Sequence, residues 1–122
     1  MEQTEEVIEM KTYIITSYGH KCKVFLEIGK YRNDRLAIEL IDVRDGPFAV
    51  LTVNLVNEQC PKNCAYLDTN NFPQGEEFVK KHKLGKPTGY YGRSGYCTYP
   101  LYRFDMAALK GKTEREPAPF GL

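Results

Sequence analysis

Hydrophobic and polar residues alternate along most of the first half of the chain. Within residues 11–29, KTYIITSYGHKCKVFLEIG, two alternating runs flank a Gly-His pair. Residues 36–55 repeat the pattern on either side of Asp45-Gly46, which tolerates the positive φ of a tight turn. Period-two alternation of β-branched and aromatic residues is typical of half-buried strands. We therefore expect four sequential strands in an antiparallel meander, the fourth being FAVLTVNL, residues 48–55.

A helical pattern follows in residues 70–85, NNFPQGEEFVKKHKLG. Pro73 suits a first helical turn, acidic residues stand near the positive end of the helix dipole, and lysines stand near its negative end. Gly85 is a plausible C-cap. The preceding LDTNN segment, which begins at Leu67, resembles an active-site loop, but its polar side chains also suit helix capping, the interpretation we favour.

Shorter elements complete the predicted fold. Residues 65–69 predict a short strand, residues 99–105 another strand, and residues 106–110 a final helical turn. The expected fold is therefore α+β: an antiparallel β-meander of about four to six strands, with one main helix packed on it and a short C-terminal helical turn. The expected organisation is an acidic flexible arm at 1–9, a single α+β domain at 10–110 and a flexible tail at 111–122.

Charge is distributed unevenly along the chain. The net charge is +1, yet residues 1–9 carry four glutamates and no basic residue. Residues 80–112 carry eight Lys or Arg against one acid, Asp105. Such a stretch would attract an anionic partner; the alternative is that its lysines only solvate a helix face and a loop. The acidic start contains no apolar segment, and no apolar run is long enough for a membrane helix, so we expect a cytoplasmic protein with no membrane partner.

The cysteines and histidines give little support for a metal site or for catalysis. Cys60 and Cys64 are four residues apart, but a structural zinc needs two further ligands, which Cys22, Cys97 or the two histidines would have to supply. Free thiols are the favoured interpretation. No nucleophile-elbow, zinc-protease or phosphate-loop motif occurs. We therefore expect no catalytic residue, no metal, no cofactor and no enzymatic activity.

The most unusual segment is TGYYGRSGYCTYPLYRFD, residues 88–105, with three glycines, five tyrosines and two arginines. Its glycines could bring backbone N–H groups to a phosphate, and its tyrosines could stack on bases or anchor a protein interface. The alternative is a loop whose tyrosines fold back over the sheet. The predicted partner-binding residues are Tyr90, Tyr91, Arg93 and Tyr96 with Lys80, Lys81, Lys83 and Lys86.

Four strings carry a resemblance to a known family: VFLEIGKYRNDRLAIELID, DGPFAVLTVNL, LDTNNFPQGEEFVKKHKLGKPTG and GRSGYCTYPLYRFD. From Tyr13 to Leu109 the chain resembles a domain-of-unknown-function family of small accessory proteins, encoded on conjugative transposons, plasmids and prophages of Firmicutes. That family has no assigned catalytic residues. Small proteins of mobile elements often block host defences, and this is what the resemblance implies here.

These observations lead to two functional hypotheses. The first is a non-enzymatic inhibitor of a host defence nuclease, of the anti-CRISPR or antirestriction type, which binds the nuclease or its guide-RNA complex. The second is a nucleic-acid-binding accessory or regulatory protein of a conjugative element. In the second case RNA or DNA would contact the basic stretch 80–112, and binding would weaken steeply with salt.

Overall fold

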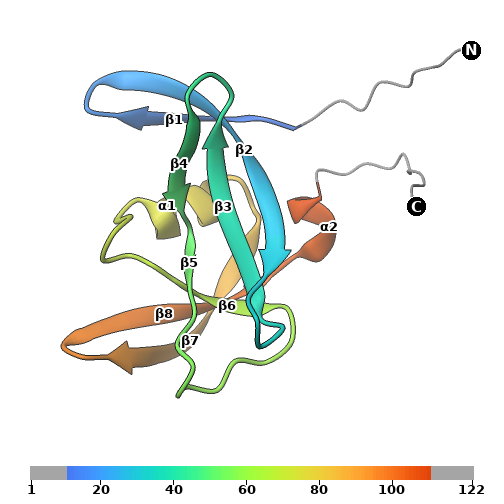
Figure 1. Cartoon of the computed structure of the whole chain (residues 1–122), viewed down its shortest axis with the longest axis vertical. Helices are drawn as coiled ribbons and strands as arrows, with labels where there is room; N and C mark the ends of the chain where they lie inside the picture. The colour runs from blue at the N-terminus through green and yellow to red at the C-terminus, as the bar shows by residue number, and fades with distance from the viewer. Residues whose placement is uncertain (1–10, 111–122) are drawn as a thin grey trace, which may run out of the picture.

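Two four-stranded antiparallel sheets form the fold in the computed structural model, which describes residues 11–110 (Figure 1). The predictions for residues 1–9 and 111–122 lie outside this range. Sheet A has the order β1-β2-β3-β4, and sheet B has the order β5-β6-β8-β7. Sheet A consists of β1 (Tyr13–Ser17), β2 (His20–Lys30), β3 (Leu36–Asp42) and β4 (Gly46–Val50). Sheet B consists of β5 (Thr52–Val53), β6 (Cys64–Leu67), β7 (Gly85–Ser94) and β8 (Cys97–Phe104).

The first hairpin follows the alternating pattern of the sequence. Ser17 pairs with His20 across a two-residue turn in which Tyr18 and Gly19 both have positive φ, 51° and 80°. This turn type matches the twist of the two strands. In β3, burial alternates residue by residue from Leu36 to Asp42, as expected for a strand with one face against a core.

The expected α+β fold, one meander covered by one main helix, is wrong: the structure consists mostly of antiparallel strands in two sheets, because the predicted fourth strand serves both of them. The strand is interrupted at Leu51, whose side chain is fully buried. Its N–H donates to the Ile38 carbonyl of sheet A (2.9 Å), and its carbonyl accepts from the Asp68 N–H beside sheet B (2.9 Å). Residues before Leu51 therefore pair with sheet A and those after it with sheet B, and Figure 1 shows the strands of the two sheets crossing.

The predicted main helix is also much shorter than expected. Helix α1 spans only Gly75–Lys81, seven residues. Its start is delayed because Asp68 holds a turn, accepting from the Asn71 N–H (3.2 Å) with its side chain and from the Phe72 N–H (2.8 Å) with its carbonyl. The LDTNN segment thus caps this turn and not α1. A second helix, α2 (Met106–Leu109), matches the predicted C-terminal turn.

The end of α1 is set by a lysine and not by Gly85. Lys83 has φ 56°, the left-handed conformation that ends many helices. The Leu84 N–H donates to the Val79 carbonyl (2.9 Å), and the Lys83 N–H to the Lys80 carbonyl (3.1 Å). Leu84 is buried, which holds the chain in place where it leaves α1, and Gly85 is the first residue of β7.

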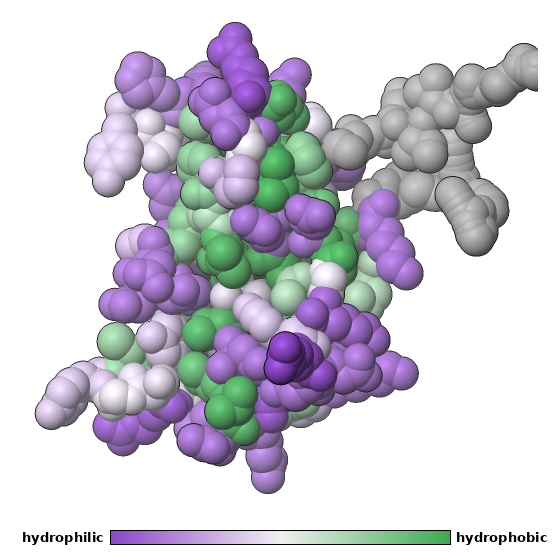
Figure 2. Space-filling model, in the orientation of Figure 1, coloured by the Kyte–Doolittle hydropathy of each residue, from purple (hydrophilic) through white to green (hydrophobic). Residues whose placement is uncertain are grey.

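The main core lies between sheet A and sheet B and includes α1. It joins residues of sheet A such as Val24, Ile38 and Leu40 with Val79 of α1 and Tyr102 of β8. A second, smaller core on the other face of sheet B contains Leu55, Cys64, Tyr66, Tyr99 and Leu101. Figure 2 shows the side of the molecule on which sheet A lies in front, where apolar atoms gather between hydrophilic ones. No helix within residues 11–110 is long and apolar enough to cross a membrane.

Candidate anion-binding site

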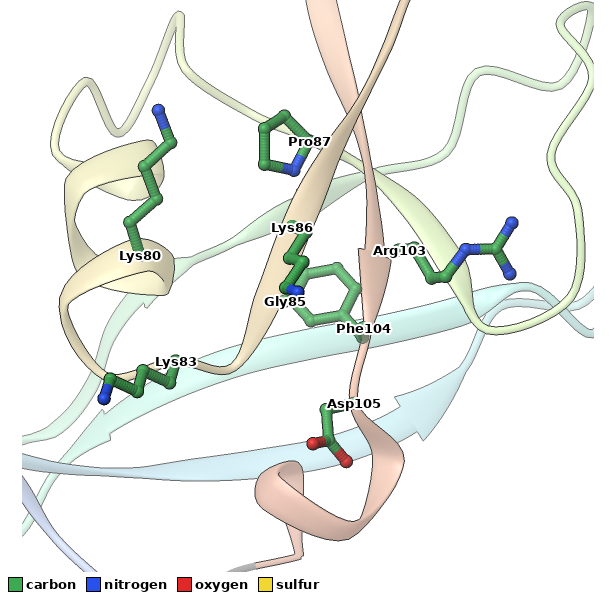
Figure 3. Close-up of a pocket in the computed structure, with 8 residues that line it drawn as sticks. All are labelled: Lys80, Lys83, Gly85, Lys86, Pro87, Arg103, Phe104 and Asp105. Carbon is green, nitrogen blue, oxygen red and sulfur yellow. The ribbon is translucent and has the colours of Figure 1, made fainter.

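A shallow hollow of about 610 Å³ lies where the end of α1 meets β7 and β8 (Figure 3). Its apolar part is formed by Phe104, Pro87 and Gly85. Its remaining lining is charged: Lys80, Lys83, Lys86, Arg103 and Asp105. Figure 3 shows Lys80 and Lys83 on the α1 side of β7, whereas Arg103 extends from β8 away from them. We call this feature the cationic hollow.

The shape of the cationic hollow depends on a close approach of two strands. Gly85 pairs with Phe104, and a Cβ atom at Gly85 would lie 2.7 Å from the backbone oxygen of Arg103. Only glycine fits at such a distance without a shift of the backbone. The early end of α1 then places Lys83 directly before this strand pair, and Lys80 one turn earlier.

Among residues 11–110, no acidic side chain forms an ion pair with the charges around the hollow. Lys86 pairs directly with Arg103 across β7 and β8, an arrangement of like charges that is unfavourable by itself. Within residues 11–110, none of the four cationic side chains forms an ion pair. The carboxylate of Asp105 is engaged elsewhere, because it accepts from the Ala107 and Ala108 N–H groups at the start of α2 (3.1 and 3.2 Å). An anion in the hollow would relieve this repulsion.

The glycine-rich segment is a strand and a hairpin, not the loop that the sequence suggested. Gly95 has φ 61° and forms the two-residue turn between Ser94 and Cys97, while Gly89 has φ 93° at the irregularity between Pro87 and Tyr91. Both conformations favour glycine. Gly89 and Gly95 therefore have structural roles in the hairpin, and this removes the basis for a phosphate-binding loop.

Gly92 is buried against an aromatic side chain. A Cβ atom at this position would lie 2.6 Å from Cε1 of Tyr66 and 2.8 Å from Cδ1 of Leu55. Tyr66 is fixed in turn, since its hydroxyl donates to the Gln59 carbonyl. Burial raises the pKa of Tyr66 to about 12, with a further contribution from the nearby Glu58 carboxylate.

The predicted partner-binding residues do not form one cluster. Lys80, Lys83 and Lys86 line the cationic hollow, whereas Lys81 is exposed at the end of α1 outside it. Tyr96 is fully exposed at the tip of the β7–β8 hairpin.

Tyr90 and Tyr91 are adjacent in β7 and so point to opposite faces of sheet B. Tyr90 is held by Glu58, to which its hydroxyl donates (3.1 Å), and this hydrogen bond raises the pKa of Tyr90. The Arg93 N–H donates to the same carboxylate (3.0 Å).

Tyr91 and Arg93 share the face of sheet B that carries Phe104, whereas Lys86 and Arg103, one position away along each strand, point to the opposite face. Tyr91 pairs with Pro100, two positions before Tyr102 on β8, so the two tyrosines lie on one face. The Tyr102 hydroxyl donates to Glu76 of α1 (2.5 Å), which identifies this face as the one beside α1. One side of the β7–β8 pair therefore carries Phe104 of the hollow at one end and Tyr91 and Arg93 toward the other.

The remaining polar candidates have separate surroundings. His82 packs its ring against Tyr13 (4.7 Å between centroids) and Phe78, and burial lowers its pKa. Asp68 holds its turn, as described above, and neither residue lines the hollow. All four cysteines are free thiols, and Cys60 donates to the Cys64 carbonyl (3.2 Å). Burial raises the pKa of the Cys60 and Cys64 thiols.

No group of three or more metal-ligating side chains occurs in the part of the chain that the structure describes. Residues that the sequence reasoning missed are Arg103, Phe104 and Asp105 of the hollow. The basic and aromatic residues of the YRFD string were visible in the sequence, but the pairing of Arg103 with Lys86 follows only from the register of β7 with β8.

A family model for a domain of unknown function, DUF4313, matches residues 25–117. No curated protein and no solved structure matches the chain.

Proposed function

The chain belongs to the DUF4313 family, whose function is unknown, and we propose that it acts by binding a nucleic acid through the cationic hollow. One observation carries the proposal: four cationic residues line a hollow with an apolar floor, and within residues 11–110 none of them has an ion-pair partner. Phosphate groups are anions that lysine and arginine bind well, and their neutralisation dominates nucleic-acid affinity.

The face next to the hollow supports a nucleic acid over a simple anion. Tyr91 is more than half exposed, and Arg93 is exposed two residues further along β7. Aromatic rings beside cations bind single-stranded bases by stacking while the cations hold the backbone. We expect the backbone of a single strand to contact the hollow and its bases to reach Tyr91.

We further propose that this binding serves a mobile-element accessory protein in the cytoplasm, which inhibits a host defence nuclease by binding the nuclease or its guide-RNA complex. The sequence resemblance to proteins of conjugative elements and prophages supports this setting. The cationic hollow supports contact with guide RNA. The alternative, a nucleic-acid-binding accessory or regulatory protein of the element itself, would use the same surface.

The direct test is fluorescence anisotropy with labelled single-stranded RNA, guide RNA and duplex DNA over a range of salt concentrations. The variant Lys80→Ala/Lys83→Ala/Lys86→Ala removes three charges from the hollow. Each neutralised phosphate contributes a slope of about 0.7 to the dependence of log affinity on log salt for single strands. We therefore expect the slope to fall by about 2, together with a large loss of affinity at low salt.

A matched control removes three charges from sheet A and its turns: Lys21→Ala/Arg32→Ala/Arg44→Ala. It has the same net charge as the hollow variant but should retain the slope. Equal losses of affinity and of salt dependence in both variants would show nonspecific charge attraction and would overturn the proposed site. Once binding is established, a nuclease assay separates an inhibitor of a host defence nuclease from an accessory protein of the element, because only the inhibitor reduces target cleavage.

A further inference from the structure

The outer face of sheet A, which points away from the main core, carries an apolar row. Phe25 pairs with Ile41, and Ile41 pairs with Pro47, so these three side chains lie side by side on three strands. Their sequence neighbours Val24 and Leu40 are buried in the core on the opposite face. Alternation along the strands therefore directs the row of Phe25, Ile41 and Pro47 outward.

Further apolar side chains border this row. Ile14 pairs with Lys23, and the Val43 N–H donates to the Lys23 carbonyl (3.0 Å). Ile14 and Val43 therefore both lie on the Lys23 side of the row. Val50 pairs with Glu39 at its other side. Ile14, Val43 and Val50 are 48%, 48% and 49% exposed. Exposed apolar side chains gathered on one face are typical of an interaction surface, and Figure 2 shows apolar atoms gathered on the side where sheet A lies in front.

The charged residues on this face are sorted by sign on the two sides of the row. Along β2 the outward positions read Lys21, Lys23, Phe25 and Glu27. Glu27 pairs directly with Glu39 of β3, so two carboxylates face each other across the strands. Like charges in such a pair are unfavourable unless a cation approaches them. One end of the face is thus basic, the middle is apolar and the other end is acidic.

We propose that a second copy of this chain covers this face, and that the protein is a face-to-face dimer through sheet A. A two-fold axis along the row of Phe25, Ile41 and Pro47 reverses the strand direction. It places Phe25 against Phe25 of the second copy, and Lys23 against Glu27 of the second copy. A two-fold interface needs a self-complementary surface, and an apolar centre between opposite charges provides one.

The dimer leaves the cationic hollow accessible. The hollow is formed by α1, β7 and β8, which lie on the core side of sheet A. The inference therefore does not depend on the proposed function. If both hold, the dimer presents two hollows, and a strand long enough to reach both would bind more tightly than it binds one.

The test uses the oligomeric state of the full chain, measured by sedimentation equilibrium over a range of concentrations. Lys23→Glu and Glu27→Lys each turn two attractive contacts of the dimer into repulsive ones. Each single variant should weaken the dimer at least about tenfold, since two ion pairs change sign. The double variant Lys23→Glu/Glu27→Lys should restore it. Both side chains are exposed, so thermal melts should show that all variants are folded.

Three results would overturn the inference. A wild-type chain that is monomeric at every concentration would exclude the dimer. A dimer that both single variants leave unchanged would have to use another surface. Folded single variants that are monomeric, with no recovery in the double variant, would show that the charges do not meet across the interface.

Discussion

Gly92 allows the most specific prediction about the glycine-rich hairpin. Replacing glycine with alanine in ordinary extended backbone stabilises a protein by about 0.4–1 kcal/mol, because the unfolded chain loses freedom. Gly92→Ala should do the opposite. Its new Cβ would lie 2.6 Å from the Tyr66 ring and 2.8 Å from the Leu55 side chain, both of which are buried.

The magnitude follows from how little these neighbours can move. Tyr66 is 1% exposed, and its hydroxyl donates to the Gln59 carbonyl, so its ring has no free space to enter. Overpacking a well-filled core costs about 1–3 kcal/mol. In a domain of this size, each kcal/mol lowers the melting temperature by about 4–8 °C. The lower entropy of the unfolded chain offsets about 0.4–1 kcal/mol of this cost, so the net destabilisation reaches about 2–2.6 kcal/mol at most.

The assay is urea unfolding of the wild type, Gly92→Ala and a matched control, Gly29→Ala. Gly29 also lies in a strand, but no atom lies within 4 Å of the Cβ that it would gain. We expect Gly29→Ala to be neutral or slightly stabilising and Gly92→Ala to be destabilising. Equal stability of the two variants would refute the idea that Gly92 exists to admit Tyr66.

Two other predictions concern Tyr66 and Asp105. An unfolded Tyr66 ionises near its ordinary pKa of 10.0, but the folded protein keeps the proton until about 12. The contribution of Tyr66 to stability should therefore be fully present below pH 10 and be lost as the pH rises from 10 to about 12. In thermal melts at alkaline pH, Tyr66→Phe should flatten this loss of stability. The exposed Tyr96→Phe should leave it unchanged. Asp105→Ala removes the cap of α2 and should cost about 0.5–2 kcal/mol in urea unfolding. It also removes the one acid among the described residues that line the hollow, so RNA affinity should rise while stability falls; a parallel fall of both would contradict the electrostatic reasoning.

Alternation along the chain was sufficient to predict the first hairpin and β3, because local pattern and tertiary environment agree there. It could not predict the break at Leu51. Residues 48–55 read as one strand, and only the partners of Leu51, the Ile38 carbonyl and the Asp68 N–H, show that the two halves belong to different sheets. Those partners are distant in sequence, so no local pattern contains this information.

The length of α1 and the position of the cationic hollow could not be predicted for related reasons. The apolar and charged pattern of residues 70–85 suits a longer helix, but the turn held by Asp68 delays its start and the left-handed Lys83 ends it early. The glycines of β7 suggested a loop, although they serve a hairpin turn, a strand irregularity and the contact with Tyr66. The basic character of residues 80–86 was visible in the sequence. Its meeting with Arg103 needed the register of β7 with β8.

The central claim is that the cationic hollow is the nucleic-acid contact. The most direct measurement is a two-dimensional amide NMR titration of the full chain with a short single-stranded RNA. The account predicts that resonance shifts concentrate at residues 80–87 and 103–105, and extend along β7 to Tyr91 and Arg93. Shifts confined to the outer face of sheet A, or the absence of shifts at low salt, would contradict it.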